Sequence, residues 1–200
     1  LIMLREAGCD AVFCPDDLEM YGQSSIIKVD FGSMDKVMEG KFRPGHFSGV
    51  AIVVSKLFNV IQPDNAYFGQ KDWPQFAIIR QLVDELKFNL ALHCVPIVRE
   101  PDGLAMSSRN LRLNQSQRVH AKVYFQALTW AKEELKSGND LQHVKQGVKD
   151  MVDQTPEMRL EYLELTDSRN LNILETNKDN TGILCIAGYA GDVRLIDNMF

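Results

Sequence analysis

The sequence predicts an α/β protein, with a partial parallel sheet in its first half and a smaller α+β part after it. Apolar residues recur at helical spacing in residues 48–61 and 76–86, and a short apolar run of strand length follows each stretch. A strand, a helix and a second strand in this order form a βαβ unit, which builds parallel sheets. After residue 110, two helical patterns precede three strand-like runs, an order typical of α+β domains.

Short elements are predicted before the first long helix. Residues 1–7 read as the end of a helix that Gly8 stops. The apolar residues 11–13 predict a short buried strand, and the weak alternation of residues 26–30 predicts another. Residues 32–40 are expected to form a loop or a short helix.

Two amphipathic helices flank a short strand at residues 66–68. The sequence QPDN ends the first helix. Asp72 can cap the second helix, and Pro74 falls in its first turn, where a missing N–H costs nothing. A second apolar run of strand length extends over residues 90–98. The expected buried stripes are Val50, Val53, Val54, Leu57, Phe58 and Ile61 in the first helix and Phe76, Ile79, Leu82, Val83 and Leu86 in the second.

The second half begins with a helix start at Asn114 and Gln117, which resembles a capping box. The change of pattern places a domain boundary near Val98, with a hinge through the sequence REPDG. We therefore expect one domain over residues 1–97 and another over residues 98–200. The predicted elements of the second half are helices over residues 117–136 and 141–152 and strands over residues 159–165, 182–187 and 193–196.

Composition and charge exclude several classes of protein. The chain has 200 residues, of which 45% are hydrophobic and 24% charged, as in ordinary water-soluble proteins. No apolar stretch approaches the roughly 20 residues of a membrane span, so we expect no membrane partner. A net charge of −5 argues against general nucleic-acid binding, which uses a basic face, but it leaves room for one local anionic ligand. The chain opens within a helical pattern without an initiator methionine, so we expect that an upstream part is missing.

The cysteines and histidines do not form a metal-binding pattern. Cys9, Cys14, Cys94 and Cys185 include no CxxC pair and lie mostly in apolar runs, which predicts inert core residues. The four histidines are scattered without zinc spacing. The sequence therefore assigns no metal-ligating residue.

Two polar stretches follow the predicted parallel strands. The sequence FGQKD places Gly69 and Lys71 at the end of one strand, and the loop containing SSRN follows the next. Ligands of open parallel sheets bind at the carboxyl ends of the strands, so both stretches are expected at one edge. A lysine point charge, hydroxyls and a guanidinium are suited to phosphate. The alternatives are a surface lysine paired with Asp72, a plain turn glycine and a linker turn.

A third stretch, EGKFRPGHF, puts Lys41, Arg43 and His46 before the first long helix. Helix N-termini favour anions, although His46 is equally compatible with a hydrogen-bonded core histidine. The sequence contains neither common glycine-rich nucleotide loop, so a bound nucleotide would have to use another arrangement.

Three segments resemble the pantoate–β-alanine ligase (pantothenate synthetase) family. They are EGKFRPGHFSGVAIVVSKLFNVIQPDNAYFGQKDWPQFAIIRQLV, VPIVREPDGLAMSSRN and GDVRLIDN, in this order across nearly the whole chain. The resemblance implies a Rossmann-like nucleotidyltransferase domain related to class I aminoacyl-tRNA synthetases, with a smaller C-terminal lid domain. It implies a cytoplasmic homodimer that uses ATP and Mg²⁺ to convert pantoate to pantoyl adenylate with release of pyrophosphate. The amine of β-alanine then attacks the adenylate and yields pantothenate and AMP.

The resemblance also implies roles for individual residues. Lys71 would bind the α- and β-phosphate region, and the SSRN loop would correspond to the synthetase KMSKS loop. The implied catalytic residues are Lys71, Ser107, Ser108 and Arg109. The implied ATP contacts add Gly69, Asp72, Val98 and Met106, and the implied pantoate contacts are Gln75, Arg43, Val53 and Val54.

The chain departs from the family pattern at Gln70 and Pro74, where the family usually has glutamate and a polar residue. The family's HxGH signature would belong before Leu1, so the chain as written is expected to be incomplete for activity. Two other readings stay open: a non-catalytic fragment that binds nucleotide or a sister chain, and a nucleotidyltransferase that makes a different adenylate. Gln75 and the paired valines favour pantoate over the latter.

Overall fold

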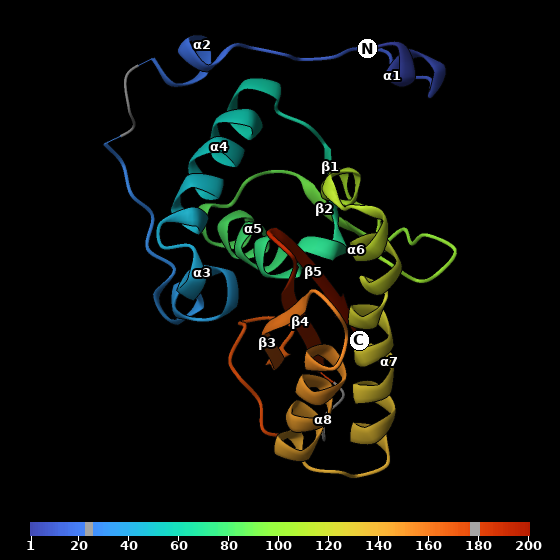
Figure 1. The fold of residues 1–200 in the computed structure, drawn as a ribbon. Coiled ribbons are helices and arrows are strands. Elements are labelled where there is room, and N and C mark those ends of the chain that lie inside the picture. The colour runs from blue at the N-terminus through green and yellow to red at the C-terminus, as the bar shows by residue number, and fades with distance from the viewer. Residues whose placement is uncertain (23–25, 177–180) are drawn as a thin grey trace.

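The computed structural model describes residues 1–22, 26–176 and 181–200. Its first part contains two short helices, α1 (Ile2–Glu6) and α2 (Asp17–Tyr21), joined by residues without regular structure. These elements project from one end of the main body (Figure 1), and α2 contacts α4 (His46–Ile61), where the Lys56 ammonium donates to the carbonyl oxygen of Met20. The helix end predicted before Gly8 is confirmed.

The strands predicted at residues 11–13 and 26–30 are absent. Val12 and Phe13 are 46% and 50% exposed, and Ile26 is 96% exposed. A strand needs a neighbouring edge to bond its N–H and C=O groups, and none of the described strands pairs with these segments. Apolar character alone therefore did not make either run a strand.

A short helical region leads into the first long helix. It consists of the 3₁₀ helix η1 (Gly32–Lys36) and α3 (Met38–Phe42), which confirms the expected short helix, and α4 (His46–Ile61) follows. The buried stripe of α4 runs through Phe47, Ala51, Val54 and Phe58. Ile61, which was expected in this stripe, is exposed at the last residue of the helix.

The predicted βαβ unit is present. It comprises β1 (Asn65–Gly69), the 3₁₀ turn η2 (Gln70–Asp72), α5 (Trp73–Leu86) and β2 (Ala91–Val95). The strands pair in parallel, from Asn65 opposite Ala91 to Gly69 opposite Val95, so both end at the same edge. Asp72 occupies the N-cap position of α5, although its side chain makes no capping hydrogen bond.

The second half is α+β, as predicted. The capping box of Asn114 and Gln117 starts α6, and the helical stretch predicted over residues 117–136 divides into two helices. The three strands form an antiparallel sheet in the order β3–β4–β5. The elements are η3 (Ser108–Arg112), α6 (Gln115–His120), α7 (Val123–Lys136), α8 (Leu141–Asp153), β3 (Met158–Asp167), β4 (Gly182–Ala190) and β5 (Val193–Met199).

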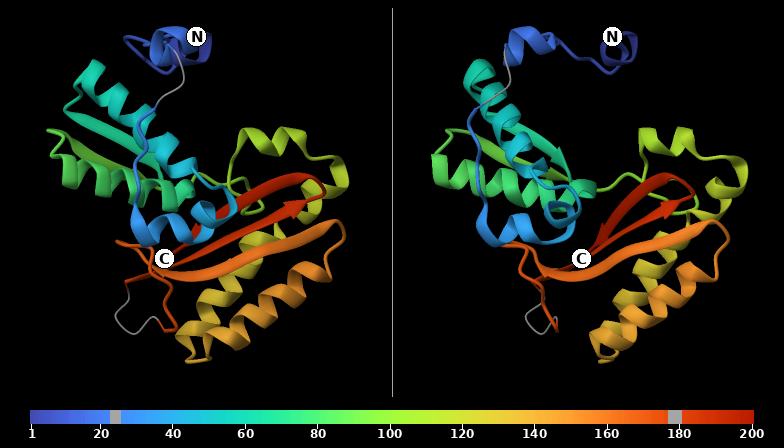
Figure 2. Two further views of the ribbon diagram at one scale, coloured as in Figure 1. Left: turned by 90° about the vertical axis from the view of Figure 1, so that its left-hand side faces the viewer. Right: turned by 60° about the vertical axis from the view of Figure 1, so that its left-hand side comes forward.

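Helices α7 and α8 cover one face of the antiparallel sheet, and elements of the first half of the chain pack against one end of the other face (Figure 2). Leu184 and Ile186 of β4 pack toward α7 and α8. Ile183 and Cys185, which alternate with them, pack in a cluster with Phe47 of α4 and aromatic residues of α5. This cluster therefore joins the βαβ unit to the second half.

The cysteine prediction is correct for only one residue. Cys185 is buried, and burial raises the pKa of its thiol. Cys9, Cys14 and Cys94 are exposed, because the first two lie in the N-terminal segment away from the core and Cys94 lies on the little-covered strand β2. Within the described part of the chain, no helix has the length and apolar character needed to cross a membrane.

Candidate active site

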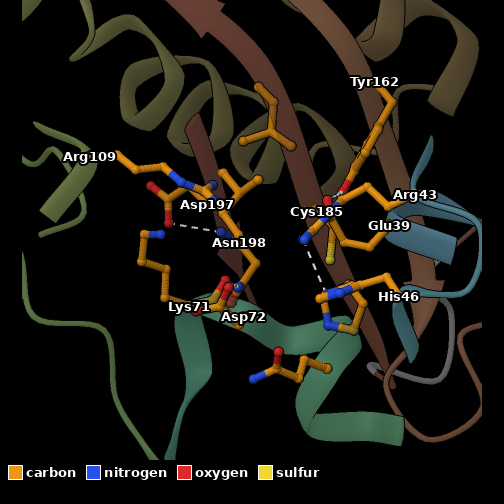
Figure 3. A pocket seen from close by; sticks show the side chains of 14 residues that line it. Glu39, Arg43, His46, Lys71, Asp72, Arg109, Tyr162, Cys185, Asp197 and Asn198 are labelled. Atoms are coloured by element: carbon orange, nitrogen blue, oxygen red, sulfur yellow. Dashed lines mark hydrogen bonds and ion pairs between the residues drawn. The ribbon is translucent and has the colours of Figure 1, made fainter. Parts of the chain in front are cut away.

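A cavity of about 220 Å³ lies where the end of β1, the region of α3 and α4, and strand β5 meet. Lys71, Asp72, Arg109 and Asp197 lie on one side of it, and Glu39, Arg43, His46 and Tyr162 lie on the other (Figure 3). The remaining lining residues are Pro74, Gln75, Cys185, Ile186, Ile196 and Asn198.

Lys71 reaches the cavity from η2, directly after β1. Burial lowers the pKa of its ammonium, and the nearby Arg109 guanidinium lowers it further, against the attraction of Asp72 and Asp197. No ion pair joins Lys71 to Asp72 or to any other carboxylate of the described residues, so the expected alternative of a paired surface lysine is not seen. The positive charge therefore faces the cavity without a fixed partner.

Arg109 brings the SSRN loop to the same cavity. The backbone N–H of Arg109 donates to the hydroxyl oxygen of Ser107 over 3.2 Å, at the start of η3. A bridge between Arg99 and Ala105 closes the hairpin that leads into this loop. The two stretches expected at one edge thus meet through the side chains of Lys71 and Arg109.

The other predicted nucleotide contacts do not line the cavity. Ser107 and Ser108 belong to the Arg109 loop, and Met106 precedes them with an exposed side chain. Val98 is exposed between β2 and the hairpin, and a Cβ at Gly69 would meet nothing within 4 Å. Their contacts with a nucleotide stay predictions.

Arg43 and His46 form a pair on the opposite side of the cavity. The Nη1 atom of Arg43 lies 3.1 Å from Nε2 of His46, which accepts the hydrogen bond in its neutral form. Burial lowers the pKa of His46, and the charge of Arg43 lowers it further. His46 lines the cavity at the start of α4, so it is a polar wall residue and not a core histidine.

Of the predicted pantoate contacts, Gln75 and Arg43 line the cavity, whereas Val53 and Val54 do not. Both valines lie in α4, and they belong to the apolar cluster formed with α5 and β1. A contact between the valines and pantoate stays a prediction.

Sequence reasoning missed a charge cluster in the wall of the cavity, built around the buried carboxylate of Glu39. The carboxylate of Glu39 accepts hydrogen bonds from Nη1 and Nη2 of Arg194 over 3.0 and 2.7 Å, and from the Tyr162 hydroxyl over 3.2 Å. Arg43 lies 3.6 Å from the same carboxylate. Burial raises the pKa of Glu39, but hydrogen bonds and charges from Arg194, Tyr162 and Arg43 outweigh it and hold the pKa below its ordinary value. Glu39 and Arg194 lie in two of the three segments that resemble the ligase family. This resemblance was the feature of the sequence that could have pointed to them.

A second missed pair joins the hairpin to β5. The two guanidinium nitrogens of Arg99 donate to the two carboxylate oxygens of Asp197 over 2.6 and 3.0 Å. Burial raises the pKa of Asp197, and Arg99 opposes this shift. Arg99 is thereby fixed at the base of the loop that carries Arg109.

The described residues contain no group of three or more histidine, cysteine, aspartate or glutamate side chains suited to a metal ion. Mg²⁺ bound with a nucleotide usually takes one or two carboxylates together with phosphate oxygens and water. Among the described cavity residues, Asp72 is the carboxylate without an ion pair, and it stands beside Lys71. One unpaired carboxylate fits this kind of site.

Comparisons with known proteins agree with these features. The sequence model described as Pantoate-beta-alanine ligase matches residues 1–200. Pantothenate synthetase of Cytophaga hutchinsonii is 46% identical over 98% of this chain and 70% of its own length, and that of Aquifex aeolicus is 42% identical over 99% and 70%.

Solved structures give the same result. Pantothenate synthetase from Thermus thermophilus superposes with a TM-score of 0.90 at 37% identity, covering 99% of this chain and 72% of that one. Pantoate-beta-alanine ligase from Francisella tularensis, solved in complex with beta-gamma ATP and β-alanine, gives a TM-score of 0.75 at 28% identity. That match covers 100% of this chain and 67% of the other.

Proposed function

The chain belongs to the pantoate–β-alanine ligase family, whose activity is ATP-dependent synthesis of pantothenate, and we propose that its cavity activates pantoate as an acyl adenylate. The observation that carries the proposal is the convergence of Lys71 and Arg109 on one cavity, without an ion pair to either among the described residues. These two cations match the negative charge of a triphosphate.

The chemistry explains why cations are needed there. A carboxylate is a poor acyl donor because its leaving group would be oxide, and adenylation replaces this group with AMP. The first step brings the pantoate carboxylate toward the α-phosphorus of ATP, so positive charge must already surround the phosphates. In our proposal, Lys71 stabilises the charge at the α- and β-phosphates, and Arg109 does so from the loop with Ser107 and Ser108.

The substrates would occupy different parts of the site. We assign pantoate to the side with Gln75 and Arg43, which offer an amide and a guanidinium, with Val53 and Val54 as its expected apolar contacts. Gly69, Asp72, Val98 and Met106 would surround the nucleotide. The amine of β-alanine then attacks the acyl carbon, AMP leaves with the bonding electrons, and the nitrogen releases a proton to water to give pantothenate.

ATP would enter with Mg²⁺, which neutralises phosphate charge when bound. Asp72 is the residue that we assign to the ion, because its carboxylate lacks a cation partner among the described residues. This role is separate from that of Asp197, whose carboxylate is occupied by Arg99.

Three further features are proposals from the family resemblance. They are a homodimer, a cytoplasmic location, and a division into a nucleotide- and pantoate-binding part over residues 1–97 and a lid part over residues 98–200. Sedimentation of the intact protein tests the dimer, and a monomer at all concentrations would contradict it.

The two other readings make different predictions. A non-catalytic fragment would bind ATP without forming a product, and another nucleotidyltransferase would accept a carboxylate other than pantoate. The family membership favours the ligase over both.

The test is an omission assay with ATP, pantoate and β-alanine, using the intact protein. We expect AMP and pantothenate only when all three are present, and pyrophosphate exchange into ATP that requires pantoate but not β-alanine. The variant Lys71→Ala should reduce this exchange by about 100-fold or more while leaving the thermal unfolding midpoint nearly unchanged. Exchange without pantoate would overturn the adenylate, and near-normal exchange in the variant would remove Lys71 from its role.

A further inference from the structure

Asn198, near the end of β5, has its side-chain amide fully used by the turn that carries Lys71. Its Nδ2 group donates to the carbonyl oxygens of Gln70 and Lys71 over 2.8 and 2.9 Å. Its Oδ1 atom accepts from Nε2 of Gln70 over 3.1 Å. The residue is only 1% exposed, so water cannot replace these bonds without opening the structure.

These contacts define the orientation of the amide. Two carbonyl oxygens require donors, which places Nδ2 toward the backbone and Oδ1 toward Gln70. The backbone N–H of Asn198 also donates to Oδ1 of Asp197 over 2.8 Å. The side chain is therefore held at both of its ends.

The turn needs an external support. Gln70, Lys71 and Asp72 form a single 3₁₀ turn whose preceding residue, Gly69, provides no side-chain cap. The ammonium of Lys71 has no ion pair in the described residues, so its position depends on the backbone from which it extends. Asn198 bonds this backbone directly, from a strand 127 residues farther along the chain.

The neighbouring residue links the same strand to the Arg109 loop. Asp197 receives both guanidinium nitrogens of Arg99, and Arg99 also donates to the carbonyl of Gly103 over 3.0 Å within the hairpin. Arg99 in turn lies over the ring of Phe125 at 4.6 Å. The dipeptide Asp197–Asn198 is thus the common attachment of the two cation-bearing elements.

We propose that Asn198 is a positioning residue for Lys71, which aligns the ammonium for the first chemical step without touching the substrates itself. This inference rests on the proposed function, because it assigns to Lys71 the role argued above. A misplacement of about 1 Å can cost on the order of 100-fold in rate, which sets the size of the expected effect.

The experiment is a double-mutant cycle on pantoate-dependent pyrophosphate exchange, using the intact protein. Asn198→Ala should reduce exchange by about 10- to 100-fold in the wild-type background. In the Lys71→Ala background the same change should cost less than about 3-fold, because the group that it positions is gone. Single-turnover reaction of supplied pantoyl adenylate with β-alanine should be affected by less than about 3-fold, since that step comes after the one assigned to Lys71.

Two further variants separate positioning from general stability. Asn198→Asp keeps the size of the side chain but removes both N–H donors, so its exchange rate should fall as much as that of Asn198→Ala. If one of the two variants folds poorly, the other still provides the measurement. Arg80→Met is the matched control, because Arg80 also donates to two backbone carbonyls across the halves, those of Ser168 and Arg169, neither of which belongs to the Lys71 turn. It should leave exchange within about 3-fold of wild type.

The outcomes distinguish this inference from the proposed function. Equal losses from Asn198→Ala with and without Lys71, or equal losses in both half-reactions, would overturn the positioning role while leaving the ligase assignment intact. Unchanged exchange in Asn198→Ala would overturn it as well. Unchanged exchange in Lys71→Ala would instead refute the role of Lys71, and the positioning role with it.

Discussion

The Nη2 atom of Arg194 lies 2.7 Å from Oε1 of Glu39, although 155 residues separate them in the sequence. The same nitrogen lies 2.5 Å from Oε2 of Glu161 on β3. Glu39 lies in α3 and Arg194 in β5, so the contact fastens the short helix that precedes α4 to the antiparallel sheet. A charge cluster that is this well buried makes the stability of the site region sensitive to each of its members.

Glu39→Gln should lower the free energy of unfolding by about 1.5–3 kcal/mol at neutral pH, the usual cost of a hydrogen bond to a charged group. In this variant Arg194 would keep its hydrogen bonds to Glu161, which limits the loss of stability. Urea denaturation of both proteins provides the measurement. Glu133→Gln is the control, because Glu133 forms an exposed pair with Lys136 and its loss should be barely detectable.

The contribution of Glu39 to the free energy of unfolding should decrease as the pH falls. Its folded-state pKa lies below the ordinary value of 4.5, so its ionised form contributes stability above that pH and loses this contribution as the pH falls through the folded-state pKa. The difference in unfolding free energy between wild type and Glu39→Gln should be constant near neutrality and shrink in acid. A difference that grows on acidification would contradict this account.

Lys71→Arg should extend activity to higher pH. Burial lowers the pKa of Lys71, so the charge needed at the phosphates is lost at a lower pH than for an ordinary lysine, whereas arginine stays charged. The pH profile of pyrophosphate exchange should therefore fall at a higher pH in the variant, whatever its maximum rate. Because pyrophosphate exchange does not require β-alanine, titration of the β-alanine amine does not affect this profile. Lys87→Arg, at the exposed end of α5, should leave the profile unchanged.

Gly40→Ala should destabilise the protein by about 1–3 kcal/mol, because an added Cβ would lie 2.4 Å from the backbone oxygen of Asp35. Gly40 adjoins Glu39 in α3, so activity should fall as well. Gly49→Ala is the matched control in α4, where a Cβ would meet nothing within 4 Å and should add about 0.4–1 kcal/mol of stability. Equal unfolding midpoints for the two variants would refute the packing argument.

ATP should protect the loop around Arg109 from trypsin. If the guanidinium binds phosphate, cleavage after Arg109 and Arg112 should slow as ATP saturates the site, since proteolysis requires local opening. Cleavage after Lys136, at the end of α7, serves as the internal reference. Identical rates at Arg109 with and without ATP would count against closure of this loop over the nucleotide.

The sequence alone predicted the elements that local interactions define. The βαβ unit follows from apolar spacing within each segment, and the Asn114–Gln117 capping box joins residues three apart. The placement of Lys71 and the Arg109 loop at one edge also follows, because parallel strands end on the same side.

Only the tertiary structure decided which of these groups have partners. Apolar spacing at residues 11–13 and 26–30 could not reveal that no described strand would pair with them. In the sequence Glu39 looks like an ordinary surface charge, and only the structure shows that Arg194 and Tyr162 from distant strands bind its carboxylate. Likewise, only the structure shows that the amide of Asn198 binds the turn that carries Lys71. The physical reason is that burial and ionic pairing depend on distances between segments far apart in the chain, whereas periodicity depends only on neighbours.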